Sequence, residues 1–132
     1  MNLLLDTHTF LWFAGRQQYA LLPTATRDVL EDRANTLSLS YASVWEIAIK
    51  ISVGKLQLTE PVTDLVRFQQ AKIDLQLLPF KIDHLDLVER LPFHHKDPFD
   101  RLLIVQAQVE GFTVVSIDAA FDRYGVNRLW LT

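Results

Sequence analysis

The chain has 132 residues, enough for one domain that buries a hydrophobic core without metal or disulfide staples. It contains no cysteine, which excludes a disulfide scaffold, a zinc-thiolate site and a thiol nucleophile, and is compatible with a reducing cytosol. With 13 Lys and Arg against 16 Asp and Glu, the formal net charge is −3, which argues against a broad basic surface for indiscriminate nucleic-acid binding but permits a local basic rim.

The amino terminus, MNLLLDTH, begins with a short apolar run. It has no basic region ahead of that run, and Asp6 interrupts it after three leucines. A secretory signal peptide needs a basic start and a longer apolar stretch, and a membrane-spanning helix needs about 20 apolar residues. We therefore expect neither a signal peptide nor a membrane span.

Short runs typical of strands alternate with helical patterns along the chain, which predicts an α/β domain with a mainly parallel sheet of about four to five strands. In the first half the pattern indicates the strand Asn2–Leu5, helices over Thr7–Ala14 and Thr24–Ala34, the strand Thr36–Ser40, and a helix from Tyr41 that stops at Gly54.

The second half continues the alternation. It indicates helices over Pro61–Ile73 and Ile82–Leu91, a short strand within Leu75–Pro79, a helix from Pro98 to Gly111, a buried strand within Phe112–Asp118, a short helix over Ala119–Tyr124, and a closing strand within Asn127–Thr132. There is no internal repeat, low-complexity segment or linker. We therefore expect residues 1–132 to form a single domain.

The stretch HHKDPFDRLLIVQAQVEG, His94 to Gly111, has two interpretations. Asp97 at an N-cap, proline at the first helical position and Asp100 three residues after the cap together form a recognised helix start. On this interpretation both aspartates stabilise the helix and nothing catalytic is needed. The second interpretation depends on where the other acids of the chain lie.

Four acids occupy comparable places on the predicted scaffold. Asp6 and Asp118 each follow a strand directly, Glu46 lies about two turns into a helix, and Asp100 lies in the first turn of another. The carboxyl ends of parallel strands meet at one edge of a sheet, so these side chains should converge there. Crowded carboxylates repel unless a cation compensates, and hard oxygen ligands favour Mg²⁺ or Mn²⁺.

Each acid also has a structural explanation. Asp6 and Asp118 are placed to cap the helices that follow them. Glu46 interrupts a helix that is apolar on nearly every side, so it needs a partner, and Lys50 one turn later is one candidate.

The motifs LLLDTHTFLWF, SYASVWEIAIKISVGKL, HHKDPFDRLLIVQA and TVVSIDAAFDRY resemble, in the same order, the four acidic blocks of the PIN domains, and within them the small VapC-type toxins of prokaryotic toxin-antitoxin modules. The resemblance spans nearly the whole chain. It implies a Rossmann-like α/β/α fold, ribonuclease activity that depends on Mg²⁺ or Mn²⁺, a homodimer and a cognate antitoxin protein. It also implies in-line attack by water, leaving 5′-phosphate and 3′-hydroxyl ends.

Carried over by position, Asp6, Glu46 and Asp100 resemble the three central acids of the family, and Asp118 resembles its more variable fourth. Asp97 is either a metal ligand acting through water or only a cap. Asp122, a turn further on, is a weaker competitor for the fourth position.

Basic and aromatic residues flank these acids. Lys50, Lys96 and Arg101 are candidate RNA phosphate contacts, although solvated surface charge explains each equally well. His94 and His95 are adjacent and are expected to form a loop rim rather than a metal pair. Trp12, Phe13 and Trp45 are candidates for base stacking or antitoxin binding; we expect Trp45 in the core.

Other protein classes fit less well. A haloacid-dehalogenase phosphatase needs a second aspartate two residues after the first, where this chain has His8, and a dinucleotide-binding domain needs a glycine-rich turn after the first strand, which is absent. A receiver domain needs paired acids at the first strand. The serious rival is a catalytically silent PIN-like binding module whose acids are only helix caps. An apolar share of 49% is generous, and a dimer or an antitoxin helix would cover surplus apolar surface.

Overall fold

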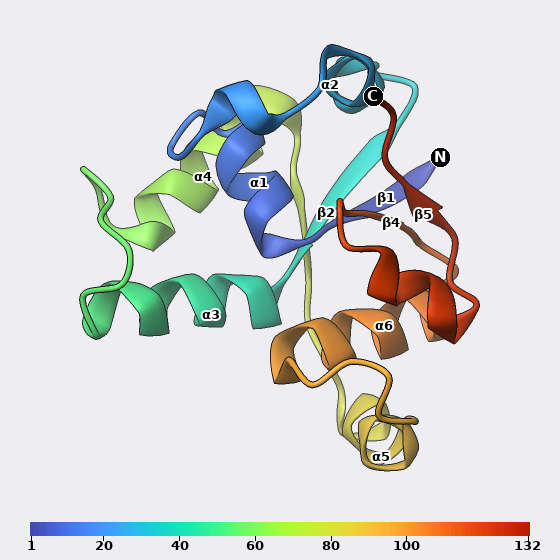
Figure 1. Ribbon diagram of the computed structural model, residues 1–132. Coiled ribbons are helices and arrows are strands. Elements are labelled where there is room, and N and C mark those ends of the chain that lie inside the picture. The colour runs from blue at the N-terminus through green and yellow to red at the C-terminus, as the bar shows by residue number, and fades with distance from the viewer.

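The computed structural model describes residues 1–132 and contains a five-stranded sheet in the order β3-β2-β1-β4-β5, with every neighbouring pair parallel (Figure 1). The strands are β1 (Asn2–Leu5), β2 (Thr36–Ser40), β3 (Gln76–Leu78), β4 (Thr113–Val115) and β5 (Arg128–Leu129). The α-helices are α1 (Thr7–Phe13), α2 (Thr24–Glu31), α3 (Tyr41–Ser52), α4 (Val62–Ile73), α5 (Ile82–Arg90) and α6 (Pro98–Glu110). Two short 3-10 helices are η1 (Tyr19–Leu21) and η2 (Ala119–Tyr124). The expected α/β fold with a mainly parallel sheet is confirmed.

The central strand β1 buries side chains on both faces of the sheet, because successive residues of a strand point to opposite sides. Leu3 and Leu5 belong to one apolar core, which they share with residues of α1 to α4. Leu4 belongs to a second core, built with residues of α6 and with Phe121 of η2. A strand that is buried on both faces reads as a continuous apolar run, which explains the three successive leucines.

The order in which the chain adds strands to the sheet reverses at β1, although all strands run parallel. The chain passes from β1 outward through β2 to β3, and then returns to the other side of β1 to form β4 and β5. In open parallel sheets, ligands bind in the crevice outside the carboxyl ends of the strands at such a point. The carboxyl ends of β1 and β4 are therefore where a site is expected.

Several boundaries differ from the expectation. The second helix ends at Glu31 rather than Ala34, because the Asp32 side chain accepts a hydrogen bond from the Ala34 amide (2.9 Å) and favours a turn. Residues 119–124 form a 3-10 helix, and the closing strand is limited to Arg128–Leu129. No helix combines the length and the apolar character that crossing a lipid bilayer requires.

Candidate active site

The four acids converge on one cavity of about 260 Å³ at the carboxyl edge of the sheet. Asp6 directly follows β1, Glu46 projects from α3, Asp100 comes from the first turn of α6, and Asp118 precedes η2. In Figure 1, α1 starts from the end of β1 with α3 and α6 nearby. The cavity is lined by Asp6, Thr7, His8, Glu46, Lys50, His95, Asp97, Asp100, Ile117 and Asp118.

Three of these aspartates do cap helices, each with one oxygen. Oδ1 of Asp6 accepts the Thr9 amide, Oδ1 of Asp97 accepts the Asp100 amide, and Oδ1 of Asp118 accepts the Ala120 amide, all at 2.9 Å. A carboxylate has two oxygens and about four lone-pair positions, so a cap occupies only part of its capacity. The capping interpretation is thus correct for these residues, and it does not exclude ligand binding by the same side chains.

Glu46 has two partners in the protein. The Thr7 hydroxyl donates a hydrogen bond to Oε1 (2.6 Å), and the Lys50 ammonium lies 2.8 Å from Oε2. The Glu46 side chain is buried whereas that of Lys50 is 34% exposed. The i, i+4 ion pair is therefore present, and it holds a lysine ammonium at the wall of the acidic cavity.

Burial and the neighbouring acids raise the proton affinity of Asp100. Burial raises the pKa of Asp100, and the nearby charges of Asp97, Asp6, Glu46 and Asp118 raise it further, to about 8. Burial also raises the pKa of Asp6, although hydrogen bonds from Ser116 and Thr9 oppose the shift. With only the protein's own charges around it, Asp100 holds a proton at neutral pH. A divalent cation would relieve this repulsion, and the oxygen-rich donor set suits Mg²⁺ or Mn²⁺.

His95 lies in this cluster although the sequence indicated a loop rim. Its Nε2 atom is 2.9 Å from Oδ2 of Asp100 and 3.1 Å from Oδ2 of Asp118, close enough to share a metal site with them. His94 is exposed as expected and packs against the Tyr124 ring. Only the loop conformation before α6 decides which ring faces the cavity, so no sequence signal distinguished the two histidines.

Arg101 has a different environment from the expected RNA contact. Its side chain is buried, and it donates hydrogen bonds to four backbone oxygens, those of Pro92 (2.9 Å), His95 (3.2 Å), Val88 (3.1 Å) and Leu91 (2.9 Å). The guanidinium also lies over the Phe93 ring. Arg101 therefore organises the loop between α5 and α6, and only Lys50 and exposed Lys96 remain available as phosphate contacts.

The remaining candidates, Asp122, Trp12 and Trp45, do not line the acidic cavity. Asp122 does not line the cavity, because its carboxylate pairs with Arg128 (2.9 and 3.0 Å). Trp12 is buried, but the expectation of a core position for Trp45 is wrong: its side chain is 57% exposed and contacts Phe99 edge-on.

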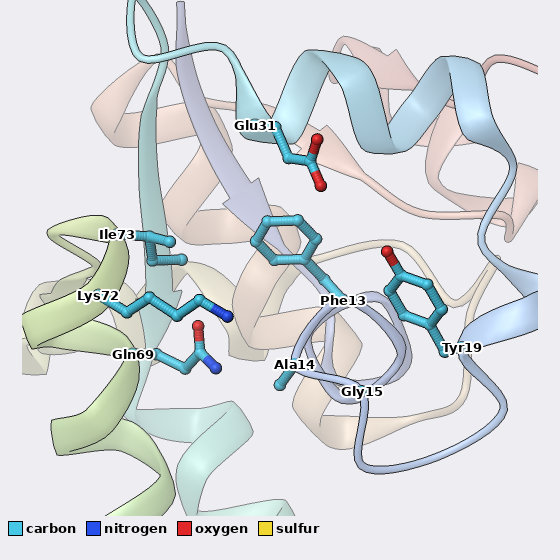
Figure 2. Close-up of a pocket in the computed structure, with 8 residues that line it drawn as sticks. All are labelled: Phe13, Ala14, Gly15, Tyr19, Glu31, Gln69, Lys72 and Ile73. Atoms are coloured by element: carbon cyan, nitrogen blue, oxygen red, sulfur yellow. The ribbon is translucent and has the colours of Figure 1, made fainter.

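A larger cavity of about 480 Å³ lies between the end of α1 and α4. Figure 2 shows Gln69, Lys72 and Ile73 of α4 on one side of it, with Phe13 and Tyr19 on the other. Glu31 is its one acidic residue, so it cannot assemble a carboxylate cluster. Size alone would select this cavity, whereas charge selects the smaller one.

The PIN domain family matches residues 3–127 of the chain. Ribonuclease VapC16 of Mycobacterium tuberculosis (strain ATCC 25618 / H37Rv) is 35% identical over 65 residues, which are 49% of this chain and 45% of that protein. The match thus spans less than half the length of this curated relative.

Three solved structures share the fold. VapBC2 from Rickettsia felis, bound to a DNA fragment from their promoter, has a TM-score of 0.73 at 18% identity and covers 99% of this chain and 100% of its own. FitAcB from Neisseria gonorrhoeae has a TM-score of 0.61 at 19% identity, covering 96% of each chain. FitAB bound to an IR36 DNA fragment has a TM-score of 0.62 at 20% identity, covering 96% of this chain and 93% of its own.

Proposed function

This chain belongs to the PIN domain family, and we propose that it is a metal-dependent endoribonuclease that acts as the toxin of a toxin-antitoxin module. One observation carries the proposal. Asp6, Glu46, Asp100 and Asp118 come from distant parts of the chain and line a single cavity in which the pKa of Asp100 is raised to about 8. Perturbed carboxylates gathered in a cleft are typical of a functional site rather than of helix capping alone.

The proposed ligands of Mg²⁺ or Mn²⁺ are Asp6, Glu46, Asp100 and Asp118, with Asp97 at the edge of the set. When bound, such an ion stabilises charge on the scissile phosphate and lowers the pKa of an attacking water. Because each capping aspartate is fixed through Oδ1, its second oxygen is held without a further loss of rotamer freedom. Preorganised ligands of this kind bind a cation without first rearranging.

The basic residues have separate roles in the proposal. The Lys50 ammonium stands at the cavity wall and moves from Glu46 to a phosphate oxygen of the substrate. Lys96, which is exposed in the loop before α6, contacts the RNA backbone further out. Neither residue reads a base, so they contribute affinity rather than sequence preference. No serine or histidine nucleophile is needed.

An RNA substrate, a cognate antitoxin and a second copy of the chain are the proposed partners. The relative named a ribonuclease supports the first, and the folds shared with VapBC2 and FitAB support the second. Exposed apolar side chains on α3 and α4 provide surface that a protein partner would cover, including Tyr41, Trp45, Ile49 and Phe68.

A cleavage assay tests the proposal. Purified protein without antitoxin is incubated with a structured RNA pool and with matched DNA, in Mn²⁺, Mg²⁺ or EDTA. Asp100→Asn is the inactive variant, and Asp122→Asn is its matched control, because Asp122 pairs with Arg128 outside the cavity. We expect metal-dependent RNA cleavage with 5′-phosphate ends that is lost only in Asp100→Asn.

The same assay addresses the silent binding module. Three aspartates do cap helices, which is the observation that favours this second candidate. If folded protein leaves the RNA uncut in every lane, with Mn²⁺, Mg²⁺ or EDTA and for several classes of RNA, the silent binding module is supported. Thermal unfolding also distinguishes the two candidates. If the acids form an intact metal site, Mn²⁺ should raise the melting temperature, because binding to the folded state stabilises it. A silent binding module should show no such increase.

A further inference from the structure

His8 lines the acidic cavity, yet neither helix capping nor the proposed metal site gives it a role. It is the second residue of α1, and its side chain is exposed. One face of the imidazole stacks on the indole of Trp12, one helical turn later, with ring centroids 5.7 Å apart and an angle of 15° between the planes. An exposed aromatic ring is thus supported on one face at the edge of the cavity.

The supporting ring of Trp12 is itself fixed in the core. Its side chain is buried, and it packs edge-on against Trp130, with ring centroids 6.0 Å apart. Side chains of a helix lean toward its amino terminus, so His8 lies on the side of Trp12 nearer the end of β1 and the acids. A ring that already rests on a buried indole loses little freedom when a ligand covers its other face.

The other face of His8 suits an unpaired nucleobase. Every base has a π-face, and histidine is among the side chains on which unpaired RNA bases stack. A base carries no net charge, so the neighbouring carboxylates do not repel it as they repel a phosphate. Stacking uses the face of the imidazole and therefore requires no particular protonation state of the ring.

We propose that His8 is a substrate-binding residue that stacks an unpaired RNA base beside the scissile phosphate, so that base, imidazole and indole form one continuous stack. The inference rests on the proposed function and deepens it. A base within a duplex is already stacked on both faces, so the contact selects single-stranded nucleotides over uninterrupted duplex RNA. Lys50 and Lys96 contact phosphates in the proposed complex, whereas His8 contacts a base.

Three substitutions distinguish stacking from the other contact open to an exposed histidine, a polar contact with a phosphate oxygen. His8→Phe keeps an aromatic face and removes both ring nitrogens, His8→Gln keeps a polar group and removes the ring, and His8→Ala removes both. Stacking predicts that His8→Phe resembles the parent protein and that His8→Gln resembles His8→Ala, whereas a phosphate contact predicts the reverse. His94→Ala is the matched control, because His94 is also an exposed ring packed on an aromatic side chain, Tyr124, but lies outside the acidic cavity.

Binding is measured with Mg²⁺ in Asp100→Asn protein, so that the RNA stays uncut. The probes are short single-stranded oligoribonucleotides with 2-aminopurine at successive positions, because its fluorescence falls when it stacks. We expect quenching at one position that His8→Phe retains and that His8→Gln and His8→Ala lose. His8→Ala should bind the intact RNA about 5-fold or more weakly, and RNA that is abasic at that position as tightly as its parent does.

Three results would overturn the proposal, with folding of each variant verified by circular dichroism. The first is equal affinity and quenching in His8→Ala and its parent. The second is binding that His8→Gln retains and His8→Phe loses, which would assign His8 to a phosphate. The third is the absence of binding to any of the oligoribonucleotides.

Cleavage by proteins that retain Asp100 separates this proposal from the nuclease. With Mg²⁺, we expect His8→Ala and His8→Gln to raise KM for RNA about 5-fold or more, and His8→Phe and His94→Ala to match wild type. If RNA is bound with the expected order of variants but is never cut, the nuclease fails and the base contact stands. If RNA is cut and KM is the same in all four variants, the base contact alone fails.

Discussion

The Lys50 ammonium lies 2.8 Å from the Glu46 carboxylate, one helical turn along α3, at the wall of the acidic cavity. It therefore offers positive charge at the place where a cation and a phosphate would both bind. A lysine in this position lowers the local repulsion among the acids. Its positive charge also opposes the binding of a metal cation to the same acids.

Lys50→Met should separate these two effects. We expect Mg²⁺ to bind several-fold more tightly, because one positive charge near the ligands is removed, and KM for RNA to rise, because a phosphate contact is lost. Calorimetry and steady-state cleavage provide the two readouts. Lys55→Met, on the exposed loop after α3, is the control. Unchanged KM in Lys50→Met would limit Lys50 to pairing with Glu46.

Asp100→Asn should abolish cleavage without unfolding the protein. The asparagine amide cannot supply the carboxylate charge, but it removes an acid that is largely buried and lies among four other acids. The EDTA-treated variant should therefore melt no lower than wild type at about pH 8, where about half of the wild-type carboxyls are ionised. If the variant melts well below wild type, Asp100 serves to stabilise the fold.

The same carboxyl predicts a pH dependence of stability. The pKa of Asp100 rises from 3.8 to about 8 on folding, so the folded state binds an additional proton between these values. Proton uptake on folding means that the free energy of unfolding decreases as pH rises through this window. Urea titrations of EDTA-treated protein at about pH 5 and about pH 9 should show a larger decrease for wild type than for Asp100→Asn. Parallel curves for the two proteins would exclude Asp100 as the cause.

Arg101→Lys should destabilise the protein rather than weaken RNA binding alone. A lysine ammonium cannot reach four carbonyls at once, and leaving buried polar groups unpaired costs about 2 to 4 kcal/mol. Chemical unfolding measures the loss, with exposed Arg67→Lys as the control. Wild-type stability combined with a weaker, salt-sensitive RNA affinity would restore Arg101 as a phosphate contact.

Two substitutions of Asp97 distinguish a cap from a ligand. Asp97→Asn keeps an oxygen that caps α6, so stability should be nearly unchanged and activity only mildly reduced. Asp97→Ala removes the cap and should cost about 1 kcal/mol. Loss of activity in Asp97→Asn equal to that of Asp100→Asn, with α6 intact by circular dichroism, would place Asp97 among the ligands.

The order and type of most elements followed from the sequence, because apolar periodicity and capping residues act over a few positions. The helix from Pro98 to Glu110 and the strand Asn2–Leu5 are examples. Ends set by side-chain turns were less predictable: Asp32 stops α2 early, and the closing strand extends only as far as β4 can pair with it.

Local sequence patterns predict which acids stand at strand and helix ends, because a carboxylate that directly follows a buried strand lies at the edge of the sheet. How each acid divides its oxygens between capping a helix and facing the cavity depends on long-range contacts. The tertiary structure shows that Asp6, Asp97 and Asp118 cap helices and face the cavity with the same side chains, that Arg101 is buried, and that His95 rather than His94 meets the cluster. The positions of Asp97, Arg101 and the two histidines depend on the path of the loop between α5 and α6. That path is set by contacts among residues distant in sequence, such as His95 with Tyr124, which no local pattern encodes.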